Sequence, residues 1–104
     1  MTKKYRKLVR DKIPAIIKRT GRRPVTRVLD DKEYVEQLLE KLCEEINEFD
    51  EDRNAEELAD VVEVLMALAN ALGISQQELK KVRNKKALQR GTFQKRLFLE
   101  KVVG

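Results

Sequence analysis

Two helical segments joined by a short polar break constrain the fold of this chain more than any other feature. Apolar side chains recur along one face of the first segment, at Val35, Leu38, Leu39, Leu42, Cys43, Ile46 and Phe49. The second segment, residues 61–72 (VVEVLMALANAL), is apolar on nearly all sides. This second segment is expected to begin at its cap Asn54, so only the polar stretch 50–53 separates the two helices, and the sequence predicts an antiparallel helical hairpin and an all-α fold.

Capping residues predict the other boundaries. A short helix is expected over residues 7–19, with Asp11 as its cap and Pro14 in its first turn. Gly73 and Gly91 are expected to end the third and fourth helices. Short extended segments are expected near 24–29 and 96–103, and these two could pair as strands. The three remaining helix starts are predicted at Asp30 with Glu33, at Asn54, and at Ser75 with Glu78.

Length and composition restrict the class of protein. A chain of 104 residues predicts one domain spanning residues 1–104. Charged residues make up 39%, and no apolar run is long enough for a membrane span. The chain has one cysteine and no histidine, so histidine catalysis and the usual zinc sites are excluded. We expect a reduced, cytoplasmic setting.

Charge is distributed in three blocks. Residues 1–29 contain eleven Lys and Arg against one acid, residues 30–63 contain fifteen acids against three basic residues, and residues 64–104 contain nine basic residues against two acids. Folding that brings these blocks together places carboxylates among cations. A nucleic-acid binder has no evident use for the acidic middle block. This composition favours a site for a metal and a phosphate group.

Two carboxylate motifs lie on the predicted hairpin. Residues 44–48 form an EExxE pattern and residues 57–60 form an ExxD pattern. Residues three apart share a helix face, so each motif presents a carboxylate pair near the hairpin turn. Converging carboxylates repel one another, and Mg²⁺ relieves this repulsion because it binds carboxylate oxygens together with substrate phosphates. The predicted metal ligands are Glu45, Glu48, Glu57 and Asp60.

Each acidic motif taken alone is a weak signal. Glu36, Glu40 and Glu44 are better explained as the solvated face of a helix. This reading explains Glu45 and Glu48, taken alone, as well as the metal site does. Glu57 has a rival role as the capping-box partner of Asn54. The order and spacing of the two motifs, together with the basic blocks outside them, favour the metal site.

The motifs and their flanks resemble a known superfamily. EExxE followed by ExxD on antiparallel helices is similar to the all-α NTP pyrophosphatases, which include the MazG-type enzymes. The strings LVRDKIP at residues 8–14 and RGTFQKR at residues 90–96 resemble a single-domain, phosphoribosyl-ATP pyrophosphohydrolase-like subgroup. The resemblance covers nearly the whole chain, although the connection between the two acidic motifs is shorter here than in many members.

The resemblance implies a Mg²⁺-dependent nucleotide pyrophosphohydrolase, with Mn²⁺ able to substitute. Glu45 and Glu48 then have catalytic roles, with Glu44 supporting them. The implied reaction is attack of a metal-activated water that releases a monophosphate and pyrophosphate. The implied biological role is the removal of unwanted nucleotides from the pool.

Cations outside the acidic block are candidates to bind the substrate phosphates. Arg suits this role because its guanidinium contacts a phosphate with two donors. The predicted phosphate-binding residues are Lys86, Arg90, Arg96, Arg10 and Lys12. A solvated cationic face explains most of the other basic residues of the last helix. The alternative function is a basic helical nucleic-acid or protein-binding module without catalysis, which leaves the acidic cluster without a role.

The apolar third helix predicts self-association. One partner helix covers only one of its sides, and monomers rarely leave a contiguous apolar patch exposed. Two such hairpins complete a four-helix core. We therefore expect a homo-oligomer, a dimer or a tetramer, and the superfamily resemblance points the same way.

Overall fold

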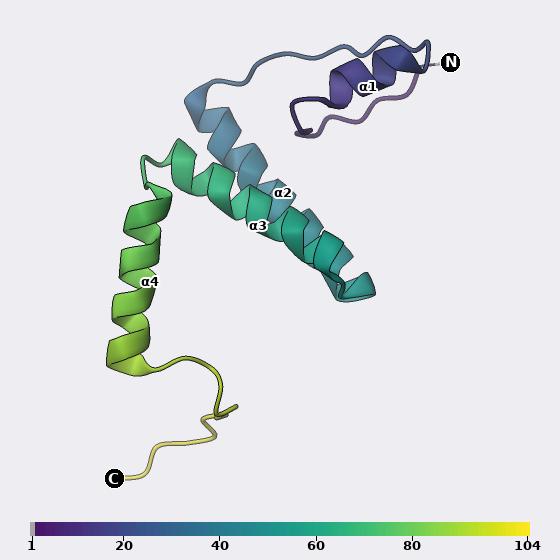
Figure 1. Cartoon of the computed structure of the whole chain (residues 1–104). Helices are drawn as coiled ribbons and strands as arrows, with labels where there is room; N and C mark the ends of the chain where they lie inside the picture. The colour runs from purple at the N-terminus through teal and green to yellow at the C-terminus, as the bar shows by residue number, and fades with distance from the viewer. Residues whose placement is uncertain (1) are drawn as a thin grey trace.

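The structure is a computed structural model that describes residues 2–104, and within them the chain is all helical (Figure 1). It contains four helices and, in the described residues, no strand. The helices are α1 (Ile13–Arg19), α2 (Asp31–Asp52), α3 (Ala55–Ala71) and α4 (Gln76–Arg90). The all-α prediction is therefore confirmed.

The helix starts follow the predicted caps. The side chain of Asp30 accepts a hydrogen bond from the Glu33 amide at 2.8 Å, and that of Asn54 accepts one from the Glu57 amide at 2.9 Å. Ser75 accepts from the Glu78 amide at 3.0 Å in the same way. These bonds satisfy amides that the first turn of each helix leaves without a partner. All three predicted starts are confirmed.

α2 and α3 lie side by side as the predicted antiparallel hairpin (Figure 1). The connection is shorter than expected, because α2 continues through the polar stretch to Asp52 and only Arg53 and Asn54 link the helices. Arg53 adopts a left-handed conformation with φ of 40°, and its amide bonds back to the Phe49 carbonyl. We call this end of the hairpin the tip.

The core lies between the two hairpin helices and is small. Leu38, Val64 and Leu68 form its buried centre. Leu8 of the N-terminal segment packs against this centre, with Tyr34, Val35, Leu42 and Ala67 around it. The segment before α1 therefore lies against the hairpin at Leu8 and covers part of its core.

α4 departs from the hairpin at the end opposite the tip. It follows α3 after the turn at Gly73, and the two helix axes differ in direction by 108° (Figure 1). No residue of α4 is buried. In the described residues no single helix is long and apolar enough to cross a membrane; the consecutive helices α3 and α4 reach that length only as a pair with this bend.

The first helix is shorter than predicted. It begins at Ile13 instead of residue 7, and Asp11 does not cap it, since the N-cap residue is Lys12 and makes no side-chain cap bond. Pro14 lies in the first turn as expected. Residues 2–12 are non-helical, and within them Leu8 packs on the hairpin core while Arg10 bonds to Asp60.

The predicted pairing of two extended segments is wrong for this chain. Neither 24–29 nor 96–103 forms a strand, and Val28 and Phe98 are 98% and 88% exposed. The first segment leads into α2, whereas the second follows α4, and Figure 1 shows them well apart. β-branched composition favours a strand only where a partner strand and a packing surface are present.

Candidate metal centre

Three carboxylates from the two hairpin helices meet near the tip. One oxygen from each of Glu45, Glu57 and Asp60 lies within 4.8 Å of the other two. Glu45 comes from α2, while Glu57 and Asp60 lie three residues apart on α3 and share a face. The EExxE and ExxD motifs are therefore brought together as the hairpin geometry requires.

Burial distinguishes this cluster from an ordinary acidic surface. Glu45 is 7% exposed, and it is the one buried charged residue of the described chain. Its Oε2 atom and the Oε2 atom of Glu57 are buried and accept no hydrogen bond from any described residue. A buried carboxylate oxygen without a partner is costly, so these two atoms point to a ligand that supplies the missing contact.

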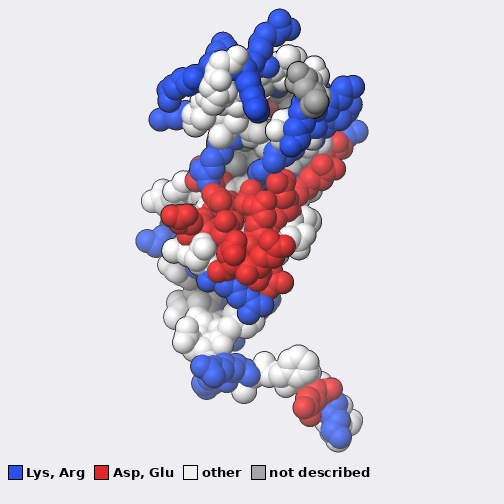
Figure 2. All heavy atoms as spheres, turned by 90° about the vertical axis from the view of Figure 1, so that its right-hand side faces the viewer, with Lys and Arg blue, Asp and Glu red and all other residues white. Residues whose placement is uncertain are grey.

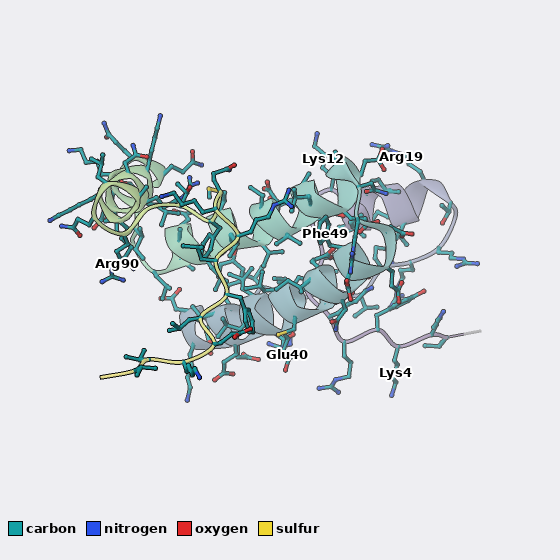
Figure 3. All side chains as sticks on the ribbon, turned by 90° about the horizontal axis from the view of Figure 1, so that it is seen from below. Lys4, Lys12, Arg19, Glu40, Phe49 and Arg90 are labelled. Carbon is teal, nitrogen blue, oxygen red and sulfur yellow. The ribbon has the colours of Figure 1, made fainter. Side chains whose placement is uncertain are left out.

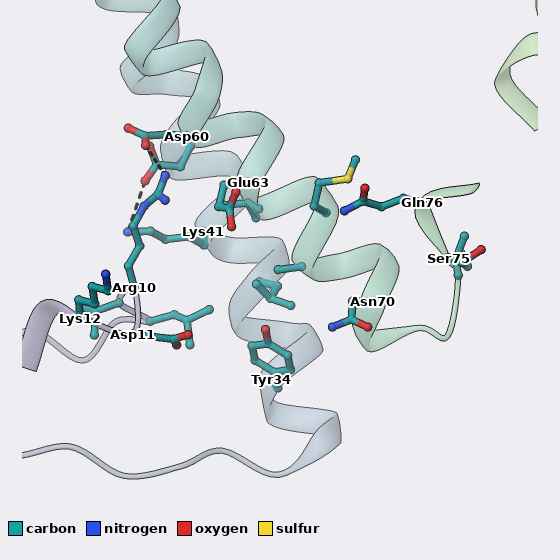
Figure 4. Close-up of a pocket in the computed structure, with 18 residues that line it drawn as sticks. Arg10, Asp11, Lys12, Tyr34, Lys41, Asp60, Glu63, Asn70, Ser75 and Gln76 are labelled. Atoms are coloured by element: carbon teal, nitrogen blue, oxygen red, sulfur yellow. Dashed lines mark hydrogen bonds and ion pairs between the residues drawn. The ribbon is translucent and has the colours of Figure 1, made fainter. Parts of the chain in front are cut away.

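Two cations neutralise part of the cluster. The Nζ atom of Lys41 lies 3.4 Å from an oxygen of Glu45, one helical turn along α2. Arg10 donates a hydrogen bond from Nη2 to Asp60 at 2.6 Å, across fifty residues of sequence (Figure 4). Both cations lie on the pocket side of the cluster, where Figure 4 shows them close together.

The carboxyl pKa values reflect this crowding. Burial raises the pKa of Glu45 above its ordinary value of 4.5, and a shared hydrogen bond and the charge of Glu48 raise it further, while Lys41 opposes the shift. Loss of hydration also raises the pKa of Glu57, and the charges of Asp60, Asp52 and Glu45 add to it. Both shifts show that the site disfavours its own negative charge unless a cation is present.

A pocket of about 820 Å³ opens beside the cluster. Figure 4 shows Arg10, Asp11 and Lys12 on one side of it and Asn70, Ser75 and Gln76 on the other. Its lining mixes the charged groups near the cluster with apolar side chains of the core. That lining also includes Tyr34, Leu38, Lys41, Glu45, Asp60, Glu63, Val64, Met66 and Ala67.

The other predicted acidic residues lie at the edge of the cluster. Glu48 is exposed and adjoins Glu45, whose pKa it influences, but it is not among the three clustered carboxylates. Glu44 faces Lys7 and Lys41, with nitrogen-to-oxygen distances of 3.7 and 3.5 Å. Of the capping box considered for Asn54 and Glu57, the structure has one half. The Glu57 amide bonds to the Asn54 side chain, whereas the Glu57 carboxylate faces the cluster.

The predicted phosphate-binding residues divide into two groups. Arg10 and Lys12 line the pocket. Lys86 and Arg90 lie on α4, Arg96 lies beyond it, and none of the three lines the pocket. Figure 3 shows Arg90 at the opposite side of the molecule from Lys12. A single chain therefore does not bring the C-terminal cations to the acidic cluster.

Lys41 and Asn70 were not among the predicted site residues, although both line the pocket. The position of Lys41 was available from the sequence, because a residue four before Glu45 lies on the same helix face. Asn70 gave no such signal. It lies near the C-terminal end of α3, and only the packing of the N-terminal segment and the α3–α4 turn makes that end part of a pocket.

The donor set fits a hard divalent cation. All three clustered ligands offer carboxylate oxygens, which Mg²⁺ prefers. The two unpartnered buried oxygens supply the independent sign that a ligand belongs there. The acidic triad could therefore hold a metal ion, with the pocket and its cations beside it.

Comparison with known proteins adds one partial match. An uncharacterized protein from Mycolicibacterium smegmatis is 54% identical over 41 residues, which are 39% of this chain and 42% of that protein. The chain thus matches about two fifths of the length of that relative. No protein-family model matches the chain, and no solved structure matches it.

Proposed function

We propose that this protein is a Mg²⁺-dependent nucleotide pyrophosphohydrolase that converts a nucleoside triphosphate or a related nucleotide to the monophosphate and pyrophosphate. The observation that supports it best is the triad of buried Glu45 with half-buried Glu57 and Asp60, beside a pocket lined by Arg10 and Lys12; two carboxylate oxygens of this triad have no hydrogen-bond partner among the described residues. An acidic centre with cations beside it is what a metal-bound polyphosphate requires. Removal of unwanted nucleotides from the pool is the role we assign.

Each part of the pocket has a proposed task. When bound, Mg²⁺ would neutralise phosphate charge, polarise the scissile linkage and help to deprotonate a water; Mn²⁺ would do the same. Arg10 and Lys12 would bind the phosphate chain once Arg10 leaves Asp60. Glu48, which is exposed beside Glu45, would accept a proton from a water, and Glu44 would hold Lys41 in position. Tyr34 offers a ring to the base.

The product identity tests this proposal most directly. A panel of nucleoside and deoxynucleoside triphosphates is incubated with the protein and Mg²⁺, and the phosphorus products are resolved by NMR. We expect pyrophosphate and the nucleoside monophosphate in equal amounts, with none formed after chelation of the metal. Release of orthophosphate and a diphosphate, or no turnover of any nucleotide with either Mg²⁺ or Mn²⁺, would overturn the assignment.

One observation favours a second candidate, a basic module that binds nucleic acid or an acidic protein without catalysis. The cations of α4 are exposed and lie away from the acidic cluster in a single chain. A nucleic-acid binder would show affinity that falls steeply with salt and needs no divalent ion. We place this candidate second, because it gives the triad and its unpartnered oxygens no task.

We also propose that the protein is a homo-oligomer, a dimer or a tetramer, with a core built from α2 and α3 of at least two chains. The exposed apolar residues of these two helices support this. A reduced cytoplasmic setting stays our expectation for its location. Light scattering at micromolar concentration tests the assembly, and a stable, active monomer of 12.2 kDa would contradict it.

A further inference from the structure

The hairpin has a second apolar face that no described residue of the same chain covers. On α2, Leu39, Cys43 and Ile46 follow a spacing of four and three residues, and Leu39 and Ile46 are about half exposed, at 51% and 48%. On α3 the same spacing recurs with similar exposure. Those residues are Leu58, Val62, Leu65 and, two turns later, Leu72. A spacing of three and four is typical of a seam between packed helices.

The exposed apolar residues of α2 and those of α3 lie on the same side of the hairpin. At about 100° per residue, Leu39 and Ile46 are turned roughly 80–100° from the buried Leu38. Leu65 is turned about as far from the buried Val64, in the same rotational sense. In two antiparallel helices that face each other, equal senses point to the same side. Asp60 and Lys41 are turned the opposite way, so the apolar face lies opposite the pocket face.

The size of the exposed surface indicates what covers this face. The chain has a radius of gyration of 18.6 Å, whereas a compact domain of this length has about 13 Å. Its accessible surface is 10320 Å² for 12.2 kDa, whereas a folded monomer of that mass exposes roughly 6,100 Å². The excess is larger than each chain contributes to an obligate homodimer, which is roughly 1,000–2,500 Å². The exposed surface is therefore ample for pairing with a second copy, whose helices carry the same spacing of apolar residues, and part of the excess belongs to α4 and the C-terminal segment, which extend from the hairpin (Figure 1).

Charge decides the direction in which two such faces pair. The exposed acids of the tip form a continuous patch in Figure 2, which views the molecule from the side of the hairpin turn. They include Glu48, Asp50, Glu51, Asp52 and Glu56. A two-fold axis along the helices would bring two such tips together, with strong repulsion. An axis perpendicular to the helices instead puts each tip at the partner's opposite end, where the basic α4 begins.

We infer that two copies pair through the apolar faces of α2 and α3 in opposite directions, so that the basic α4 of each chain lies against the acidic tip of the other. This arrangement joins the two unlike charged blocks that a single chain leaves apart. It also places Lys86 and Arg90 of one chain on the side of the partner's Glu45, Glu57 and Asp60. The active site is then shared between chains, and this part rests on the proposed function.

The direction of pairing is measured by the distance between two tips. A nitroxide label is placed at Asp52→Cys in a Cys43→Ser background, and the label-to-label distance in the assembled protein is read by pulsed electron resonance. Since α2 has 22 residues and a helix rises about 1.5 Å per residue, opposite pairing separates the tips by about 30 Å or more. A distance below about 20 Å, which parallel pairing gives, would overturn the inference, as would the absence of any intermolecular distance.

The surface is tested by a matched pair of variants on adjacent residues of α2. Ile46→Lys places a charge on the apolar face, whereas Asn47→Lys places the same charge on an exposed position beside it. We expect Ile46→Lys to shift the protein to monomer in analytical ultracentrifugation, and Asn47→Lys to leave the dimer. Equal behaviour of the two variants would contradict the assigned face. The label-to-label distance is measured on a separate protein, so it decides the direction of pairing even if either lysine variant fails to fold.

Complementation tests the shared site. A Glu45→Gln chain and a Lys86→Ala/Arg90→Ala chain are each nearly inactive alone, and they are mixed, unfolded and refolded together. In a two-fold dimer half of the random pairs are mixed, each with one intact site, so turnover should return to about a quarter of wild type. No recovery with an active wild type would show that the cations do not act across the interface. An inactive wild type would instead sink the proposed function, and the label distance would still decide the pairing.

Discussion

Replacing Glu45 by Gln distinguishes the effect of the acidic cluster on protein stability from its proposed role in Mg²⁺ binding. The carboxylate lies 3.4 Å from Lys41, an attraction of about 5 kcal/mol at an effective dielectric of about 20. An oxygen of Asp60 lies within 4.8 Å, so its repulsion is at least about 3.5 kcal/mol on the same scale. The charges of Glu57 and Glu48 add further repulsion. Because the summed repulsion is at least as large as the attraction, Glu45→Gln should leave the metal-free protein folded, with an unfolding free energy equal to that of wild type or higher by up to about 2 kcal/mol.

The response to Mg²⁺ is where the variant should differ. Wild type at ten times the Mg²⁺ dissociation constant gains about 1.4 kcal/mol, which for a chain of this length raises Tm by about 6 °C. Glu45→Gln should lose this increase, and turnover should fall by two orders of magnitude or more, since a neutral amide is a poor ligand for a hard cation. Differential scanning calorimetry with and without Mg²⁺ measures the first effect.

The matched control is Glu40→Gln, the same chemical change on the same helix. Figure 3 shows Glu40 on the side of α2 away from α3, where it is exposed. This variant should keep both the Mg²⁺ response and the turnover of wild type. If Glu40→Gln and Glu45→Gln respond alike to Mg²⁺, the metal centre is not where we place it.

Three further outcomes follow from the same geometry. Arg10→Gln should strengthen Mg²⁺ binding, because the guanidinium no longer competes for Asp60, yet lower turnover; calorimetric titration showing weaker Mg²⁺ binding would contradict this. Because the pKa of Glu45 is raised above 4.5 in the native state, the native protein binds more protons than the unfolded chain above pH 4.5. The stabilisation from protonated Glu45 is therefore complete below pH 4.5 and is lost as the pH rises through the raised pKa. The Tm of the metal-free protein, measured against pH, should accordingly change less in Glu45→Gln than in wild type. Arg90→Ala should lower kcat/KM by the equivalent of about 1–3 kcal/mol while Lys80→Ala changes little, and equal small effects would favour a solvated α4.

Local chemistry allowed much of the fold to be predicted. Asp30, Asn54 and Ser75 cap their helices because each cap needs only a side-chain oxygen and an amide three residues ahead. The meeting of Glu45 with Glu57 and Asp60 was also predictable, since it follows from helix periodicity and a short reversal. These features depend on residues close in sequence.

The errors and omissions arose where distant contacts decide the structure. The hydrogen bond of Arg10 to Asp60 spans fifty residues, and no periodicity predicts it. The N-terminal segment is non-helical up to Lys12 because Leu8 and Arg10 lie on the hairpin, which overrides the helical pattern there. The segment at 96–103 has the composition of a strand, but within the described chain it has no partner strand. Tertiary packing outweighed local propensity in each case.

The small core and the buried charge of Glu45 both limit the stability of the hairpin. The described chain buries five residues, and one of them is the charged Glu45, so the hairpin that builds the site is itself poorly stabilised. A cation in the cluster and a second copy on the apolar face both bind the folded hairpin and not the unfolded chain. Each therefore increases the population of the state that the other recognises, and by linkage the two effects are reciprocal. On the assignments proposed above, the metal ion and the second copy are two ligands that stabilise the same folded hairpin.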